Sequence, residues 1–227
     1  MPNHDGAARA ADARRAVRAR IRYGLVLLAL IGSFILAMVA PAAWWARVAT
    51  ALLEGGALML VLARARADRR MLALGLCAVV VTVGATLWAA SGVRTRAGAA
   101  DLASAGLLAL IPFAIGMEFR RNLTITMQSV TATLCIYVVL GMLFAAVVAA
   151  ASALAGVPYF AGRPDATTSD YTYFSFITLA TVGYGDLVPA TSLGRALAVT
   201  EGVSGQIYLV TVVALVVGNL GLRQTRG

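Results

Sequence analysis

The chain has no lysine, a single histidine (His4), and only 13% charged residues among its 227. A soluble globular domain carries about 25% charged residues, so the composition argues against that class. Hydrophobic residues make up 60% of the chain, and they occur in long blocks rather than in amphipathic stripes. This composition indicates an integral membrane protein.

Cysteine is also scarce, with Cys77 and Cys135 each inside an apolar segment. Both are predicted to behave as small buried hydrophobic residues. A disulfide framework or a metal site would need spaced clusters of cysteine and histidine, which the sequence does not contain. The sequence shows no group of acid–base or metal-binding residues that would indicate hydrolytic chemistry. We therefore expect neither enzymatic activity nor a cofactor.

The positive charge of the chain, formally +9, is carried by arginine alone. A strongly basic chain indicates a nucleic-acid or a membrane partner. Here the arginines flank the apolar blocks, which favours the lipid bilayer and argues against nucleic acid. Residues 1–22 form an Arg-rich tail that is expected to fix the topology, with binding of anionic lipid as the alternative role.

Six apolar segments follow the tail, each near the roughly 20 residues that a helix needs to cross a hydrocarbon core of about 30 Å. They are approximately residues 23–40, 44–63, 71–91, 102–117, 124–155 and 193–220. A cleaved signal peptide is an alternative interpretation of the first segment. The long tail before it favours a retained helix, and so does the pair Trp44 and Trp45 after it, which is typical of a membrane interface.

The arginines are unevenly distributed between the two sides of such a six-span chain. Fourteen of them fall on the side of the N-terminal tail, and five fall on the other side: Arg47, Arg94, Arg96, Arg163 and Arg195. Because cytoplasmic loops are enriched in positive residues, this bias predicts that both termini are cytoplasmic. It also places residues 156–192 on the outer side of the cell membrane.

Residues 156–192 differ from the apolar blocks that flank them. They contain a short amphipathic run, residues 170–180, which is too short to span a bilayer and which Ser169 or Asp170 could N-cap. A short helix with irregular backbone is tolerated at membrane depth only where protein or a water-filled cavity satisfies its polar groups. The segment therefore predicts a re-entrant loop.

The predicted short helix is followed by a glycine-rich hexapeptide, Thr181-Val182-Gly183-Tyr184-Gly185-Asp186. Potassium filters replace the water shell of the ion with rings of backbone carbonyls, which requires unusual backbone dihedral angles. Glycines at alternate positions permit such angles. We expect Val182 and Tyr184 to brace the strand from behind, Thr181 to add a hydroxyl, and Asp186 to place negative charge at the outer mouth. The negative end of the short helix would favour a cation nearby.

With these residues the sequence resembles the tetrameric potassium-channel superfamily, specifically the prokaryotic pore module of outer helix, pore loop and inner helix. The resemblance covers about residues 124–220. It is carried by Tyr173-Phe174, residues 178–186, Pro189, Gly194-Arg195 and residues 201–208.

The resemblance implies an all-α membrane protein, with six transmembrane helices and a re-entrant pore helix and selectivity filter between the fifth and sixth. It implies a homotetramer that conducts K⁺ passively and binds the ion at backbone carbonyls from Thr181 to Gly185. Tyr173 and Phe174 fall where the family places an aromatic cuff around the filter. Glu201 is expected to brace the pore loop from behind.

The inner helix carries the remaining residues that the resemblance singles out. Gly205 falls at the position of a proposed hinge, and a close contact between helices is an equally good explanation of a glycine there. Gln206, Leu209, Val213 and Val217 are expected to line the cavity and the gate.

The resemblance divides the chain into a tail (1–22), a four-helix membrane domain (23–123), the pore domain (124–220) and a short cytoplasmic tail (221–227). Four helices before a pore module is the layout of voltage-gated channels. Voltage sensing needs charge within the field, however, and residues 102–117 contain no arginine. We therefore expect weak voltage dependence or none.

Two further positions bear on regulation. Ile177 stands where some family members carry a glutamate that interacts with the aspartate after the filter, so Asp186 lacks that partner unless the Tyr173 hydroxyl substitutes for it. Glu54 lies in the middle of a predicted span, where a carboxyl group is costly. It is a candidate sensor of pH or lipid, and it could instead pair with an arginine or be protonated and hydrogen-bonded.

Two other functions remain open from the sequence. One is a weakly selective cation channel, against which Tyr184 argues. The other is a non-conducting membrane scaffold or accessory subunit.

Overall fold

The computed structural model describes residues 23–40, 43–65, 67–121, 127–214 and 218. Within these ranges all regular secondary structure is helical, apart from two isolated β-bridges. Five of the described helices are long and apolar enough to cross a membrane: Trp44–Arg64, Arg69–Ala89, Arg94–Glu118, Ser129–Ala155 and Ser192–Val213. The predicted all-α membrane fold is confirmed at this level.

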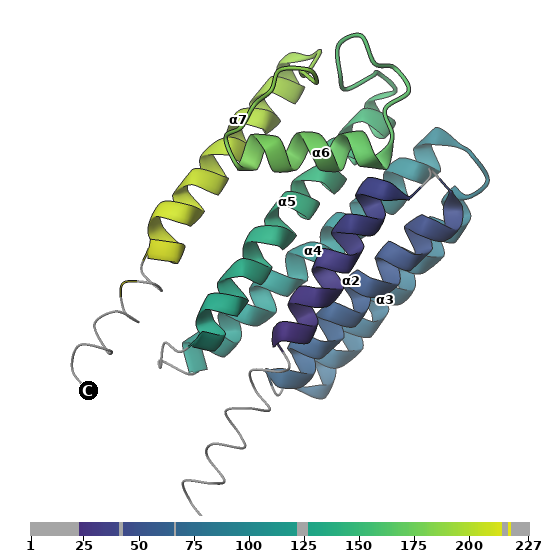
Figure 1. The fold of residues 1–227 in the computed structure, drawn as a ribbon. Helices are drawn as coiled ribbons and strands as arrows, with labels where there is room; N and C mark the ends of the chain where they lie inside the picture. The colour runs from purple at the N-terminus through teal and green to yellow at the C-terminus, as the bar shows by residue number, and fades with distance from the viewer. Residues whose placement is uncertain (1–22, 41–42, 66, 122–126, 215–217, 219–227) are drawn as a thin grey trace, which may run out of the picture.

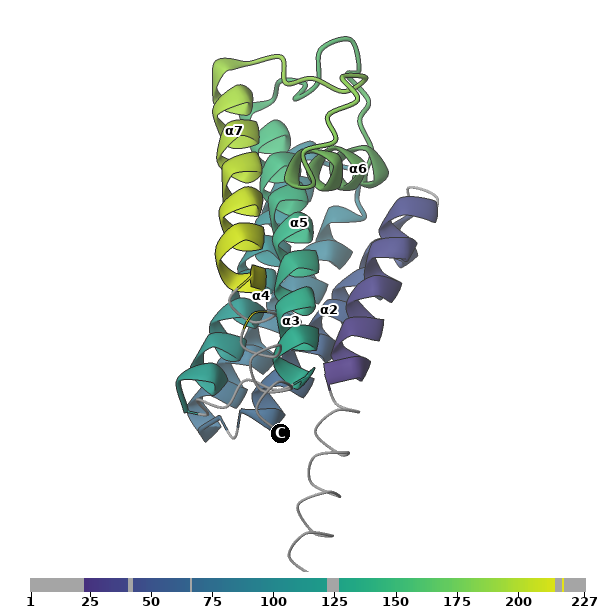
Figure 2. The same cartoon turned by 60° about the vertical axis from the view of Figure 1, so that its left-hand side comes forward.

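The helices run up and down along one direction, with one exception (Figures 1 and 2). A shorter apolar helix, Tyr23–Val39, precedes α2 (Trp44–Arg64), α3 (Arg69–Ala89), α4 (Arg94–Arg121) and α5 (Met127–Ala155). The exception is α6 (Thr168–Leu179), which lies crosswise near the upper end in Figure 1 and contacts both α5 and α7 (Ser192–Ile207). A π-helix, η1 (Tyr208–Val213), continues α7.

Close approach between α2 and α3 depends on glycines on both helices. A Cβ added to Gly55 would lie 2.8 Å from Val79, and one added to Gly75 would lie 2.5 Å from Leu62. Lipid is as apolar as the side chains, so helices in a bilayer associate through tight van der Waals packing, which small residues permit. A methyl group at Gly55 would press on the short branched side chain of Val79, and one at Gly75 would require the Leu62 side chain to move.

One buried cluster runs from the first helix to α5. Its members include the fully enclosed side chains Leu30, Leu58, Leu108, Ile111 and Val139. The first helix, α2, α4 and α5 therefore share a core, against which Leu72 and Val79 of α3 pack.

The observed α4 is longer than the predicted segment 102–117. It begins at Arg94 and ends at Arg121, which at 1.5 Å per residue corresponds to about 42 Å. Its first two turns are polar, and apolar periodicity alone does not detect them. Asp101 can lie there because Arg47 of α2 pairs with it.

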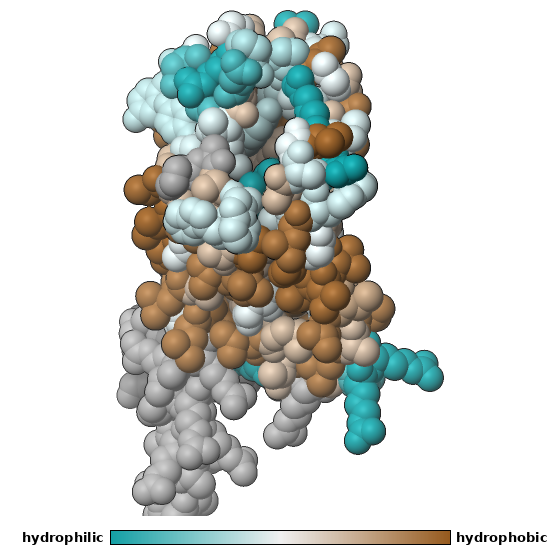
Figure 3. Space-filling view, turned by 90° about the vertical axis from the view of Figure 1, so that its right-hand side faces the viewer, coloured by the Kyte–Doolittle hydropathy of each residue, from teal (hydrophilic) through white to brown (hydrophobic). Residues whose placement is uncertain are grey.

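The surface has the pattern expected of a chain that lies in a bilayer. Figure 3 shows an apolar band around the middle of the molecule and hydrophilic residues towards its upper end. On α3 the exposed apolar side chains include Leu74, Leu76, Val80, Val81, Leu87 and Trp88. Exposed side chains of this kind match a hydrocarbon environment better than water.

Candidate functional site

The short helix α6 is fixed at its start by a capping box. The Thr167 side chain accepts a hydrogen bond from the Asp170 backbone, and the Asp170 carboxylate accepts one from the Thr167 backbone at 2.7 Å. Asp170 also pairs with Arg163 at 2.8 Å. The prediction that Ser169 or Asp170 is the N-cap is wrong: Thr167 holds that place, because Asp170 at the third helical position can then return the hydrogen bond.

The end of α6 is a Schellman motif built without glycine. The Val182 N–H donates to the Ile177 carbonyl at 2.8 Å, and the Thr181 N–H donates to the Thr178 carbonyl at 3.0 Å. These two bonds require a left-handed residue just after the helix, and Thr181 has φ +56°. A β-branched residue is costly in that region. The last turn of α6 and the first residue of the hexapeptide are therefore held as one unit.

The hexapeptide itself alternates in backbone handedness. Thr181, Gly183 and Gly185 have φ values of +56°, +55° and +81°, whereas Val182 and Tyr184 between them do not have positive φ. Glycine adopts these angles without a Cβ clash. The alternation, expected from the glycine spacing, differs from a regular strand or helix.

The hexapeptide has little cover from its own chain. All residues from 180 to 186 are exposed, and Val182 and Tyr184 are 51% and 73% exposed. We expected these two side chains to point into protein. The part of the chain that the structure describes does not supply that protein.

Asp186, at the end of the hexapeptide, has a partner on α6. Its carboxylate accepts a hydrogen bond from the Tyr173 hydroxyl. This is the substitute contact that the sequence left open when Ile177 replaced the family's glutamate. Asp186 is thus tied to the helix that precedes the hexapeptide.

Phe174 lies in a buried aromatic cluster with two residues of the loop between α5 and α6. The Phe174 ring is 5.1 Å from the ring of Phe160 and 5.7 Å from that of Tyr159, both tilted towards edge-to-face contacts. Such pairs stabilise by about 0.5–1.5 kcal/mol beyond the area that they bury. Phe160 is only 1% exposed, and the Tyr159 hydroxyl donates to the Gly194 carbonyl at 2.8 Å.

The same loop is joined to the segment after the hexapeptide by backbone hydrogen bonds. The Ala161 N–H donates to the Val188 carbonyl at 2.9 Å, and the Ala190 N–H donates to the Tyr159 carbonyl at 2.8 Å. The sequence predicts loop residues over 156–164, but it does not show that this loop is bonded to the segment after the hexapeptide. The aromatic pair Tyr159-Phe160 was the signal for a buried loop, and it was missed because an isolated pair has no periodicity.

Glu201 of α7 is completely buried behind α6. Its Oε1 is hydrogen-bonded to the Ser175 hydroxyl, and the Ser175 oxygen also lies 2.6 Å from the Gly141 carbonyl of α5. Three helices therefore meet through one serine. The sequence placed Glu201 behind the pore loop, but it did not identify Ser175 or Gly141 as its partners.

Two glycines of α7 face the carbonyl end of α6. A Cβ added to Gly205 would lie 2.6 Å from the Leu179 carbonyl oxygen, whereas one added to Gly202 would lie 3.7 Å from the Thr178 oxygen. Gly205 lies within the α-helical part of the inner helix, and the π-helical part begins three residues later at Tyr208. Of the two explanations that the sequence left open, close contact is visible in this geometry.

Gln206 and Leu209 lie on the exposed side of α7 and η1, and Val213 is half-buried. Val217 lies outside the residues that the structure describes. Exposed apolar side chains also recur along α7 at helical spacing: Val199, Val203, Ile207 and Val210. This stripe has no partner within the described part of the chain.

The second buried carboxyl group, Glu54 of α2, is hydrogen-bonded to Ser33 of the first helix at 3.2 Å. Among the described residues no salt bridge includes it. Of the arrangements that the sequence left open, the structure shows a hydrogen bond rather than pairing with an arginine.

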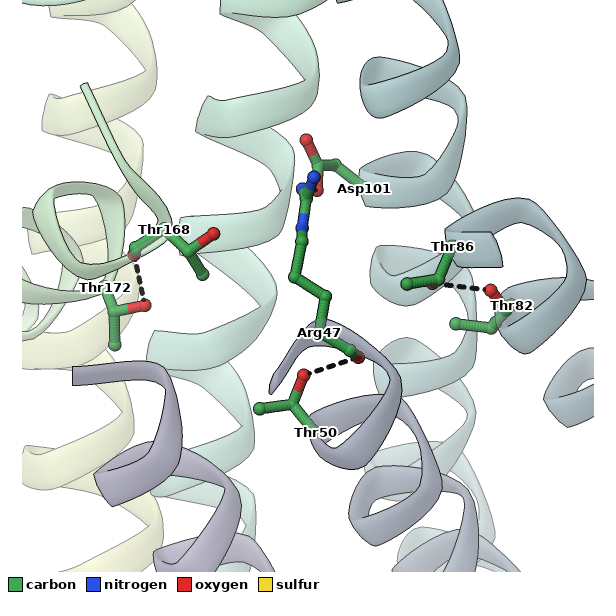
Figure 4. A network of polar contacts seen from close by, with 7 residues as sticks. All are labelled: Arg47, Thr50, Thr82, Thr86, Asp101, Thr168 and Thr172. Carbon is green, nitrogen blue, oxygen red and sulfur yellow. Dashed lines mark hydrogen bonds and ion pairs between the residues drawn. The ribbon is translucent and has the colours of Figure 1, made fainter. Parts of the chain in front are cut away.

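Ion pairs join α2 and α4 near both ends of the membrane-length helices. Towards the upper end Arg47 pairs with Asp101 at 2.5 Å (Figure 4). Towards the lower end Arg64 pairs with Glu118 at 2.8 Å, and Tyr23 donates to the other oxygen of Glu118 at 2.6 Å. These contacts fix the register of α2 against α4.

A polar cavity of about 530 Å³ surrounds the Arg47–Asp101 pair. Its wall carries hydroxyl groups from α2, α3 and α6, among them Thr50, Thr86 and Thr172. Each of these donates to a carbonyl of its own helix (Figure 4), which leaves its oxygen free to accept from the cavity. The cavity lies between the four-helix region and α6, at the level of the start of α6.

The described residues contain no group of three or more histidine, cysteine or acidic side chains that could hold a metal ion. Both cysteines are free thiols; Cys135 is buried as predicted, whereas the prediction is wrong for Cys77, which is exposed on the surface of α3. The groups that the site offers to an ion are backbone carbonyls of the exposed hexapeptide, which follows the capped helix α6, and the carboxylate of Asp186.

The comparisons with known proteins bear on this part of the chain. No curated protein matches the sequence. A family model described as "Ion channel" matches residues 134–220, which comprise most of α5, α6, the hexapeptide and the inner helix. Residues 134–220 are therefore similar to this family of ion channels.

Proposed function

We propose that the chain is the pore-forming subunit of a homotetrameric channel that conducts K⁺ selectively and passively. The observation that carries the proposal is the exposed, alternately left-handed backbone from Thr181 to Gly185 at the end of a capped short helix. Four such segments around one axis would present rings of carbonyl oxygens, and Asp186 would place negative charge at the mouth. K⁺ is the conducted ion.

The tetramer is supported by what the single chain leaves uncovered. Val182 and Tyr184 are largely exposed, and the apolar stripe along α7 and η1 has no partner among the described residues of its own chain. Neighbouring subunits would bury both. Tyr173, Phe174 and Glu201 support the filter from within the subunit, while Gln206, Leu209, Val213 and Val217 line the inner cavity.

In the proposed topology six helices span the membrane, including the shorter Tyr23–Val39, and α6 is the re-entrant pore helix. Both termini are cytoplasmic, so the hexapeptide faces the outer side. The chain then comprises the tail 1–22, which can contact anionic lipid, the four-helix domain 23–123, the pore domain 124–220 and the tail 221–227.

Strong voltage gating is not expected of this four-helix domain. Two of its arginines, the partly buried Arg47 and Arg64, each pair with a carboxylate of α4. A charge that moves through the whole field gains only about 2.3 kcal/mol per 100 mV, and each pair would have to break for its arginine to move. Glu54 is the remaining candidate for sensing pH or lipid in this domain.

The deciding experiment is the reversal potential of the purified protein in planar bilayers under a K⁺/Na⁺ gradient. We expect it to approach the K⁺ equilibrium potential, and we expect Tyr184→Ala to move it towards zero while Tyr137→Ala, on α5, leaves it unchanged. A wild-type potential near zero would instead indicate the weakly selective cation channel. Tetramers that pass no current at any pH or voltage would indicate the non-conducting scaffold.

A further inference from the structure

The contacts of Glu201 determine how many protons the site behind the filter must hold. The Ser175 oxygen lies within hydrogen-bonding distance of two acceptor atoms, the Gly141 carbonyl oxygen and Glu201 Oε1. A serine hydroxyl has one proton, so it can donate to only one of them. The other contact would bring two oxygens together without a proton if Glu201 were a carboxylate.

A protonated Glu201 resolves this count. The Glu201 carboxyl group then donates to Ser175, and Ser175 donates to the Gly141 carbonyl, so both contacts are hydrogen bonds. A carbonyl cannot donate, which fixes the direction of the chain from α7 through α6 to α5. The bonds are thus oriented only when the proton is present.

The surroundings of Glu201 also favour a neutral group. Its side chain is completely buried, and its Oε2 has no hydrogen-bond partner. A buried carboxylate with an unpartnered oxygen is far more costly than a buried neutral acid in the same place.

Among the described residues, no positive group compensates a charge at this position. In the described part of α5, from 127 to 155, the sequence has no charged residue, and on α6 the only one is Asp170, which pairs with Arg163. The other charged residue of α7 is Arg195, which is exposed. Tyr159 is the titratable group close enough to interact with Glu201, and its hydroxyl donates to the Gly194 carbonyl.

We propose that Glu201 is a neutral, proton-bearing residue that acts as a hydrogen-bond donor and locks α7 to α6 and α5 behind the filter. It is a positioning residue, since it contacts no ion. The inference rests on the pore module alone and holds whether or not the pore selects K⁺. Loss of the proton would leave two acceptors facing each other and would release the C-terminal half of α6.

Two variants of similar size separate a donor from a merely bulky side chain. In Glu201→Gln the side-chain amide donates to Ser175 in place of the carboxyl group, whereas Glu201→Met fills the space without a donor. We expect the Gln variant to retain wild-type thermal stability and ion flux, and the Met variant to lose most of its flux. A Gln variant as impaired as the Met variant would overturn the proposal, and so would a Met variant equal to wild type.

The proton itself can be observed without any flux measurement. Infrared spectra of the reconstituted wild type at neutral pH should show the carbonyl band of a protonated carboxylic acid. Glu201→Gln should remove part of this band, and Glu54→Gln serves as the matched control for the other buried carboxyl group. Spectra in which Glu201→Gln removes only an ionised-carboxylate band would refute a neutral Glu201, even if the channel conducts as proposed.

Discussion

Gly205 and Gly202 offer a matched pair for testing the contact between the inner helix and the filter end of α6. Both lie on α7, and both face carbonyl groups of the last turn of α6. Only at Gly205 would a methyl group meet the Leu179 oxygen at 2.6 Å; at Gly202 the corresponding distance to the Thr178 oxygen is 3.7 Å, an ordinary contact. The prediction is that the same substitution has opposite effects at the two positions.

The magnitudes follow from two opposing effects. Replacing a mid-helix glycine by alanine stabilises a helix by about 1 kcal/mol, and this gain applies at both positions. Overpacking costs about 1–3 kcal/mol, and it applies only at Gly205, because a backbone carbonyl cannot rotate away as a flexible side chain can. Gly202→Ala should therefore raise the free energy of unfolding by up to about 1 kcal/mol. Gly205→Ala should lower it by up to about 2 kcal/mol per subunit.

The measurement is the denaturation midpoint of each variant in detergent micelles, titrated with a denaturing detergent and followed by helical circular dichroism. Ion flux from liposomes is measured on the same preparations. Gly205→Ala should also reduce flux, because displacing Leu179 moves the start of the hexapeptide. A Gly205→Ala protein as stable as Gly202→Ala would refute the close-contact argument. Unchanged stability with altered open probability would instead favour a hinge at Gly205.

Three further predictions concern other parts of the molecule. A cavity lined by charged and hydroxyl groups should be hydrated. In a background without native cysteines, a charged, membrane-impermeant thiol reagent added on the filter side should therefore label Thr50→Cys. Labelling of the core control Ala57→Cys at the same rate would contradict this. Either single change, Arg47→Asp or Asp101→Arg, should lower the free energy of unfolding by about 1–3 kcal/mol, as for a partly buried pair. The double variant, in which the two charges are exchanged, should recover at least half of that loss. A double variant no more stable than the single variants would show that the pair is not coupled. Ile177→Glu should change the decay of current during long depolarisations, because it adds an acid near the Tyr173–Asp186 contact; identical kinetics in wild type and variant would argue against a role for that contact.

The hexapeptide and the helices around it could be predicted because their signals are local. Gly183 and Gly185 can be recognised in the sequence as positions that can adopt positive φ, and their φ values in the structure are +55° and +81°. Apolar blocks of membrane length predicted α2 almost to its ends, residues 44–63 against Trp44–Arg64. Each of these features depends on residues within a turn or a single helix.

Polar ends and loops were predicted less well, for a related reason. The start of α4 carries Asp101, which is stable in a helix at this depth because Arg47, 54 residues away, pairs with it. The Tyr159-Phe160 pair lies in a segment predicted only to be loop, and the almost complete burial of Phe160 was not predicted. Hydropathy and periodicity record the composition of a segment, and they do not record which distant segment covers it.

The sequence by itself determined that the chain lies in a membrane, that it is helical, and that a filter-like backbone follows a short helix. Tertiary structure decided which polar groups meet: Glu201 with Ser175, Glu54 with Ser33, and Asp186 with Tyr173. The physical reason is that these contacts depend on the rotation and register of packed helices. In lipid, register is set by close approach at small residues such as Gly205 and by pairs of buried polar groups, both of which require the partner helix to be known.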